Sequence, residues 1–398
     1  MKTDAQRAID ARLALWAGFF VMGVVSMAWV PRIPEMKDAI GLSNGQFGFV
    51  FVGGTLGAVC GAQLAGRAIH TFGSRPVVSV SIILMPTGLI LMGLANSALS
   101  LITGLFVMGL GYALTDMSVN SQAVVVEKIL QQKWMSSFHG MWSAGAFVTT
   151  VFGGAVAAHF SPRTNLVSIG IVCIFLFIPT VFRLLPPSLD EHAGEEDEET
   201  EAKIPFFGKS VLPLWAIGLG LIAGMVSEGA ASDWGAILLR DNMGIGRGLN
   251  ASAFACFALA MITSRFLGDK AYERFGPHKT VKLGGYIGGA VWGSCIAIAV
   301  PLSSHNQIAA LIIADIGFIF AGLGIGPMFP AFILAASRVK GIASAVAISR
   351  VGVIGIAGFF IGPTLTGLIA QATSLSWAMT YPVGMMLLAG FMSRAITE

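Results

Sequence analysis

The sequence predicts an all-α membrane protein with twelve transmembrane helices in two pseudo-symmetric six-helix bundles. Of its 398 residues, 55% are hydrophobic and only 11% are charged, which is too little charge to cover a soluble domain of this length. Apolar runs of about 20 residues recur along the chain, and each can cross roughly 30 Å of hydrocarbon as a helix. One long polar segment separates these runs into two sets of six.

The basic residues predict the topology of these helices. The expected spans are, in chain order, 12–31, 44–67, 76–96, 99–126, 139–160, 164–183, 211–239, 249–268, 281–300, 307–337, 342–370 and 375–393. A cytoplasmic N-terminus places most of the 24 Lys and Arg on the cytoplasmic side, so we expect both termini in the cytoplasm. The first span lacks a small-residue cleavage site after it, so we expect no cleavable signal peptide. The net charge of +3 then reflects topology and does not imply nucleic-acid binding.

The long polar segment, 186–209, predicts the domain organisation. It is rich in Asp and Glu and is flanked by Pro, which is typical of a solvated linker. We therefore expect an N-terminal bundle, 1–185, an acidic cytoplasmic linker, and a C-terminal bundle, 210–398.

The two bundles resemble each other in sequence. Gly73 follows the second span and Gly276 follows the eighth, in similar surroundings. The stretch "MGLGYAL" around Gly109 in the fourth span likewise matches "AGLGIGP" around Gly322 in the tenth. Internal duplication of this kind is common in transporters, whose substrate site lies between the repeats.

The loops after the second and eighth spans carry two degenerate copies of a motif of the type G-x-x-x-D-R-x-G-R-R. The matching positions are Gly66, Gly73 and Arg75 in the first copy and Asp269, Glu273, Arg274 and Gly276 in the second. With the six-plus-six architecture and the central loop, these loops resemble the major facilitator superfamily over essentially the whole chain. The stretches "SEGAASDW" and "SFHGMWSAGAF" also resemble bacterial permeases related to the fucose and hexose proton symporters.

The resemblance implies a fold in which spans one, four, seven and ten line a central cavity. It further implies a monomer in a bacterial cytoplasmic (inner) membrane, with a small-molecule substrate and without a cofactor. A cytoplasmic gating role for the two loop motifs is part of the same expectation. The four cysteines and six histidines show no metal-ligand spacing, so we expect no metal site.

Asp116 is the first candidate site residue, because a carboxylate inside a span costs roughly 2.5–3.5 kcal/mol on insertion scales. Tyr112, Asp116 and Asn120 are spaced i, i+4, i+8 and should share one helix face suited to a hydroxylated ligand. There Asp116 would bind substrate and carry the coupling proton. The alternative is a structural carboxylate that ties the fourth span to a neighbour, for example through Arg350.

The remaining intramembrane charges are candidate binding or gating residues. Glu228 shares a face of the seventh span with Ser232, and we expect both to contact substrate. Asp233 and Asp315 are expected to have either gating or structural roles. We expect Arg350 to be the sole basic residue inside a span, and it should form a salt bridge with an acid of the other half, or bind a substrate anion. Arg32 is expected at the outer interface rather than at a ligand.

These features predict a secondary active transporter rather than an enzyme. The chain has no Walker motif and no hydrolase motif, and Asp116 favours coupling to a proton. The fifth span lacks the Gly-Pro pair typical of drug–proton antiporters, which favours symport of a small polar solute such as a sugar. A Gly-Pro pair in the eleventh span keeps a second hypothesis open, a proton-coupled exporter of drugs or metabolites.

Overall fold

The computed structural model describes residues 3–132, 134–157, 159–189, 208, 211–339, 342 and 344–396, and within these ranges the regular structure is entirely helical. The chain divides into two compact units. Unit 1 comprises Met1–Leu42 and Val50–Glu198, and unit 2 comprises Ser43–Phe49 and Glu199–Glu398. Most of the predicted acidic linker, 186–209, lies outside the described residues.

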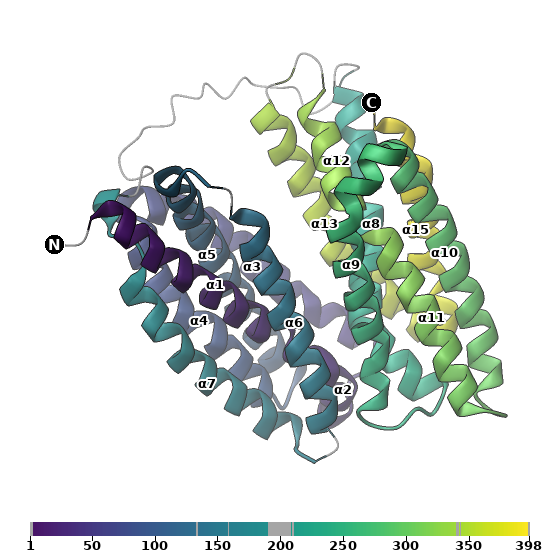
Figure 1. Ribbon diagram of the computed structural model, residues 1–398. Coiled ribbons are helices and arrows are strands. Elements are labelled where there is room, and N and C mark those ends of the chain that lie inside the picture. Colours follow the sequence, from purple (N-terminus) through teal and green to yellow (C-terminus); the bar gives the residue numbers. More distant parts are fainter. Residues whose placement is uncertain are drawn as a thin grey trace. The chain divides into compact units, whose positions relative to one another are not determined.

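Unit 1 is built from long helices that run back and forth along one another (Figure 1). Its elements are α1 (Asp4–Met27), η1 (Val30–Arg32), α2 (Ile33–Ile40), α3 (Asn44–Phe72, apart from its start up to Phe49), α4 (Ser74–Gly93), α5 (Ala98–Leu130), α6 (Met135–Ala157), α7 (Pro162–Arg183) and η2 (Pro187–Leu189). Within the unit, α4 packs against α5 and α7, and α1 packs against α5, α6 and α7.

Unit 2 repeats this arrangement with shorter helical pieces between the spans. Its elements are α8 (Leu212–Ile237), the π-helical turn η4 (Leu238–Asn242), η5 (Leu249–Ala251), α9 (Ser252–Phe275), α10 (Pro277–Leu302), α11 (Gln307–Ile325), α12 (Met328–Ser337), α13 (Ser344–Ala372), α14 (Leu375–Ala378), α15 (Thr380–Met392) and η6 (Ser393–Ala395). Here α8 packs against α13 and α15, and α11 packs against α9 and α10.

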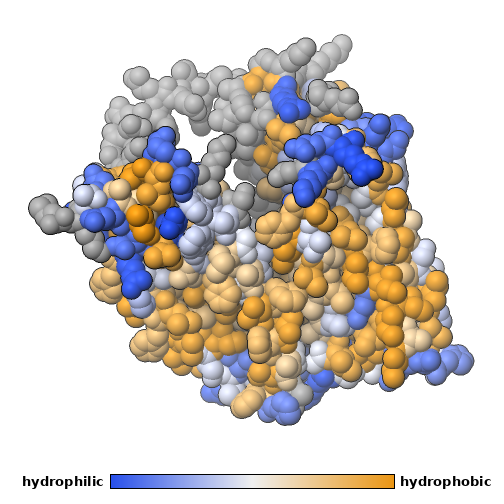
Figure 2. Space-filling model, in the orientation of Figure 1, coloured by the Kyte–Doolittle hydropathy of each residue, from blue (hydrophilic) through white to orange (hydrophobic). Residues whose placement is uncertain are grey.

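The predicted spans coincide with these helices. In the described part of the chain, eleven helical segments are long and apolar enough to cross a membrane, and α13 covers the remaining predicted span, 342–370. Figure 2 shows hydrophobic residues over the middle of the helices and hydrophilic residues gathered toward their ends. The all-α, twelve-helix prediction is therefore confirmed.

Two Gly-Pro pairs within predicted spans have different effects on the helix that contains them. At Gly326–Pro327 the helix is interrupted, since α11 ends at Ile325 and α12 begins at Met328. At Gly362–Pro363, by contrast, α13 continues as one helix through the proline.

The internal repeat is visible in the backbone itself. Gly73 and Gly276 each precede a helix with φ of +81° and +78°, a conformation that only glycine adopts without strain. A Cβ at Gly109 of α5 would overlap the carbonyl oxygen of Gly54 in α3, and a Cβ at Gly322 of α11 would overlap that of Phe257 in α9. Equivalent helix pairs thus approach closely through equivalent glycines.

We call the end of each unit where α7 ends and α8 begins the linker end. Because successive spans run in opposite directions, the linker end of unit 1 also holds the start of α1, the start of α4 and the loop from α5 to α6. Buried Gln122 of α5 organises this end. Its side chain donates to Ser74 Oγ (2.7 Å) and Leu185 O (3.2 Å) and accepts from Leu185 N (2.9 Å).

Candidate functional site

In unit 1, the candidate site is the polar stripe on α5. Asn120 Nδ2 donates to Asp116 Oδ1 at 3.1 Å and to the Asp116 carbonyl at 2.8 Å, which shows the i, i+4 proximity that the sequence predicts. Tyr112, Asp116 and Asn120 are each partly exposed, whereas Thr115 and Ser118 on the other faces are fully buried. The stripe therefore presents a phenol, a carboxylate and an amide on a partly accessible face of the helix.

In unit 2, the two acids of α8 lie in different surroundings. Glu228 keeps 21% of its side chain exposed, whereas Asp233 is buried with 8% of the residue exposed. Ser232 Oγ donates to the Gly229 carbonyl (2.9 Å) and to Asp233 Oδ1 (3.3 Å). The Ser232 hydroxyl thus hydrogen-bonds to Asp233, although its spacing also places it on the face of Glu228. Glu228 is the more accessible of the two acids.

Glu228 faces a cation that the sequence reasoning missed. Arg265 lies in the middle of α9, and its Nη2 is 3.7 Å from Glu228 Oε1. That separation is longer than a hydrogen bond, and 36% of the Arg265 side chain is exposed. The signal was present, because the predicted span 249–268 contains this one Arg within an apolar run. Arg350 is therefore not the sole basic residue inside a span.

Asp315 and Arg350 also lie in unit 2. Ser252 Oγ, at the start of α9, donates to Asp315 Oδ1 of α11 at 2.9 Å, so this acid joins two neighbouring helices. Arg350 is partly buried in α13. Its pairing with an acid of the other half stays a prediction.

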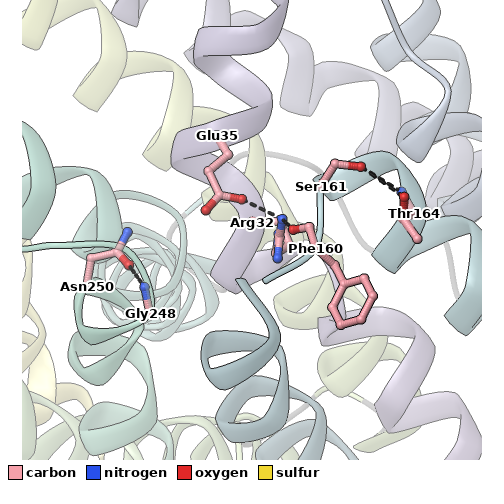
Figure 3. A network of polar contacts seen from close by, with 7 residues as sticks. All are labelled: Arg32, Glu35, Phe160, Ser161, Thr164, Gly248 and Asn250. Atoms are coloured by element: carbon pink, nitrogen blue, oxygen red, sulfur yellow. Dashed lines mark hydrogen bonds and ion pairs between the residues drawn. The ribbon is translucent and has the colours of Figure 1, made fainter. Parts of the chain in front are cut away.

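Arg32 is buried rather than interfacial. Its residue is 0% exposed, its Nη2 donates to the Phe160 carbonyl at 2.6 Å, and it is 2.8 Å from Glu35 Oε2 (Figure 3). The hydrogen bond from Arg32 to Phe160 connects the segment after α1 to the loop between α6 and α7, at the end of unit 1 opposite the linker end. The environment is that of a structural ion pair, because both charges are largely removed from water.

The loop-motif residues lie at the linker ends. Gly66 is in the last turns of α3 with open space around it, Gly73 caps α4, and Arg75 is the second residue of α4. In unit 2, Glu273 and Arg274 are exposed at the end of α9, and Arg274 lies over the Phe275 ring at 5.3 Å. Gly276 precedes α10, and the side chain of Asp269 lies outside the described residues.

The sequence is similar to a known protein family and to two bacterial membrane proteins. The sequence profile of the Major Facilitator Superfamily matches residues 15–346. An uncharacterized MFS-type transporter of Yersinia pestis is 29% identical over 99% of this chain and 97% of its own length. The membrane protein MosC of Rhizobium meliloti is 26% identical over 91% of this chain and 84% of its own.

Solved structures share the fold. A structure of the nucleoside transporter NupG has a TM-score of 0.77 at 11% identity and covers 98% of this chain and 100% of its own. A D-xylose-proton symporter has a TM-score of 0.72 at 12% identity and covers 98% of each chain. At these identities the similarity shows the fold alone.

Proposed function

This chain belongs to the major facilitator superfamily, and from that premise we propose that it is a proton-coupled symporter for a small polar solute such as a sugar. Transport proceeds by alternating access, with the solute bound by polar side chains of the spanning helices. A coupling proton and one small molecule are its partners, in the cytoplasmic membrane of a bacterium.

The observation that carries this proposal is the Asp116–Asn120 pair on the accessible face of α5. A carboxylate at this depth is costly and persists where it has a function. Asn120 supplies Asp116 with one hydrogen bond (3.1 Å) but no compensating charge, so the acid can take up and release a proton. Tyr112 and Asn120 beside it offer donors and acceptors to hydroxyl groups of a solute.

The Glu228–Arg265 pair gives further support. Neither side chain makes a hydrogen bond within the described residues, and the 3.7 Å separation leaves room for rearrangement. A guanidinium has five donors and a carboxylate has two acceptor oxygens, so the pair can exchange its mutual contact for contacts to a polar solute. Glu228 therefore remains a candidate substrate-binding residue, with Arg265 as its companion.

The proposed orientation puts the linker end of each unit in the cytoplasm. Basic residues gather at the helix ends there, with Arg75 and Arg183 in unit 1 and Arg274 and Lys279 in unit 2. Such an excess marks the cytoplasmic side of membrane proteins.

Asp116→Asn tests the coupling role. The amide keeps hydrogen bonding but cannot titrate, so we expect this variant to lose uphill accumulation driven by a pH gradient while retaining solute exchange. The measurement is uptake into proteoliposomes over a panel of sugars, organic acids and amino acids, with and without the gradient. Asp4→Asn, at the exposed start of α1, is the control. Normal uphill accumulation by Asp116→Asn would exclude the coupling role.

The same vesicles test the second hypothesis, a proton-coupled exporter. The observation that favours it is the Gly362–Pro363 pair within continuous α13, which resembles the antiporter signature although it lies in a different span. Efflux of cationic dyes driven by the gradient, without sugar uptake, would establish export. Solute uptake that collapses with the gradient would establish symport.

A further inference from the structure

A basic pocket lies at the linker end of unit 1, outside the candidate transport site. Its volume is about 310 Å³, and its charged lining comes from three helices: Arg7 and Asp10 of α1, Arg75 of α4 and Arg183 of α7. Three guanidinium groups face one carboxylate here, so the pocket carries an excess of positive charge.

The fold holds Arg75 and Arg183 in place through their neighbours. Gln122 donates to Ser74, the residue before Arg75, and exchanges two hydrogen bonds with Leu185, two residues after Arg183. Gln122 is 1% exposed, so these bonds are shielded from water. The start of α4 and the end of α7 are thereby fixed to the same side chain, and the pocket is a built feature of the unit.

The arginines of this pocket have few partners among the residues that the structure describes. In the described part of the chain, neither Arg75 nor Arg183 makes a side-chain hydrogen bond or ion pair. Arg7 is 4.0 Å from Asp4 in a largely exposed pair, which is a weak interaction. Arg75 and Arg183 thus offer two planar guanidinium groups whose donors have no partner among the described residues, and their geometry matches the oxygens of a phosphate group.

The equivalent place in unit 2 is satisfied internally. His278 follows Gly276 as Arg75 follows Gly73, and its Nδ1 is 2.8 Å from the Ser393 carbonyl. Arg394, after the last long helix of unit 2, lies over the Phe391 ring at 4.6 Å. The duplicated fold therefore does not require an open basic pocket at this position. Among the described residues, the open arginines at this position are a feature of unit 1 alone, which points to a ligand.

The pocket borders the lipid. Phe182, which lines it next to Arg183, is 72% exposed on α7, a helix with many exposed apolar side chains facing outward. A side chain of this kind belongs in the acyl region, and the arginines beside it belong at headgroup depth. Basic pockets between spanning helices at this depth favour anionic headgroups.

We propose that this pocket binds a phosphate group held between Arg75 and Arg183 and supplied by an anionic phospholipid of the surrounding leaflet. The site is independent of the transported solute and of the coupling proton. Phe182 packs against the acyl chains, while Arg7 adds a third positive charge around the phosphate.

The test uses the purified full-length protein in detergent, with bound lipid counted by native mass spectrometry. The probes are phosphatidylglycerol, phosphatidylcholine with the same acyl chains, and inorganic phosphate. The test variant combines Arg75→Gln with Arg183→Gln. The matched control is Arg163→Gln, which removes an exposed arginine at the other end of the same helix, α7. Lipid-free melting temperatures check that both variants fold.

We expect the wild type to prefer phosphatidylglycerol over phosphatidylcholine, and the double variant to bind it about tenfold more weakly, with the control unchanged. Lysine at both positions keeps the charge but not the planar guanidinium with its paired donors, so it should give an intermediate affinity for phosphatidylglycerol. Inorganic phosphate that binds the wild type as well as phosphatidylglycerol, with the same loss in the double variant, would assign the phosphate to a free anion and overturn the lipid source. Equal binding by wild type and double variant, or equal loss in Arg163→Gln, would overturn the pocket itself.

Discussion

At the scale of single residues, the intramembrane acids differ in what faces their carboxylates. Asp116, Asp233 and Asp315 each accept a hydrogen bond from a neutral side chain of their own unit. Glu228 instead faces the Arg265 guanidinium at 3.7 Å, with both side chains partly exposed. A neutral donor holds an acid in place whatever is bound nearby, whereas a loosely held ion pair responds to any charged or polar group that enters.

Removing the charge of this pair separates a structural role from a functional one. A partly exposed pair contributes about 1 kcal/mol or less to stability, so Glu228→Gln and Arg265→Gln should change the melting temperature only slightly. We expect each single variant to lower solute uptake about tenfold or more, because each leaves the other charge without its companion. Thermal unfolding and proteoliposome uptake on the same preparations measure the two effects.

The control for this experiment is a second ion pair near the end of the same helix. Arg240 Nε is 2.6 Å from Asp241 Oδ1 in η4, directly after α8. Neutralising Arg240 and Asp241 together should leave uptake unchanged. If the double variant of Glu228 and Arg265 transports normally, the pair has no part in solute binding.

At the scale of helices, sequence reasoning succeeds within one element and loses accuracy between elements. The contact of Asp116 with Asn120 follows from helical periodicity alone. The contacts of Glu228 with Arg265 and of Asp315 with Ser252 depend on the register of neighbouring helices, which an apolar run does not specify. Arg32 shows the same limit: its position after the first span was predictable, but its burial depends on the loop carbonyl of Phe160.

The close approaches of helices predict which glycines tolerate a side chain. Gly109→Val and Gly322→Val each force a branched side chain against the backbone of a neighbouring helix, of α3 and α9 respectively. We expect each to cost about 1–3 kcal/mol or more, as overpacking does, and to lower the yield of folded protein. Melting temperature and monodispersity in detergent measure the effect.

Gly66 supplies the control for these variants, because it lies in α3 with open space around the position of a Cβ. Gly66→Ala should be neutral or stabilising by up to about 1 kcal/mol, since alanine favours a helix over glycine. A stable Gly109→Val variant would mean that α3 and α5 do not meet at this point.

At the scale of the whole chain, duplication explains what the two units share and also where they differ. The glycines that shape the backbone recur, as Gly73 with Gly276 and Gly109 with Gly322 show. The polar side chains do not recur in the same way, because His278 bonds to a carbonyl where Arg75 borders an open pocket. Composition and repeats were therefore sufficient to predict the fold, while the chemistry of each unit has to be established from its own contacts.

The basic residues also predict the direction in which the whole chain inserts into the membrane. Two exposed serines allow this direction to be measured. Ser188 lies in η2 after α7, at the linker end, and Ser304 lies after α10, at the opposite end. In a background where Cys60, Cys173, Cys256 and Cys295 are alanine, Ser304→Cys should react with a membrane-impermeant maleimide in intact cells. Ser188→Cys should react only after the cells are permeabilised, because the proposed orientation leaves the basic linker end in the cytoplasm. The reverse pattern would invert the topology, and with it the leaflet whose phospholipids reach the pocket of Arg75 and Arg183.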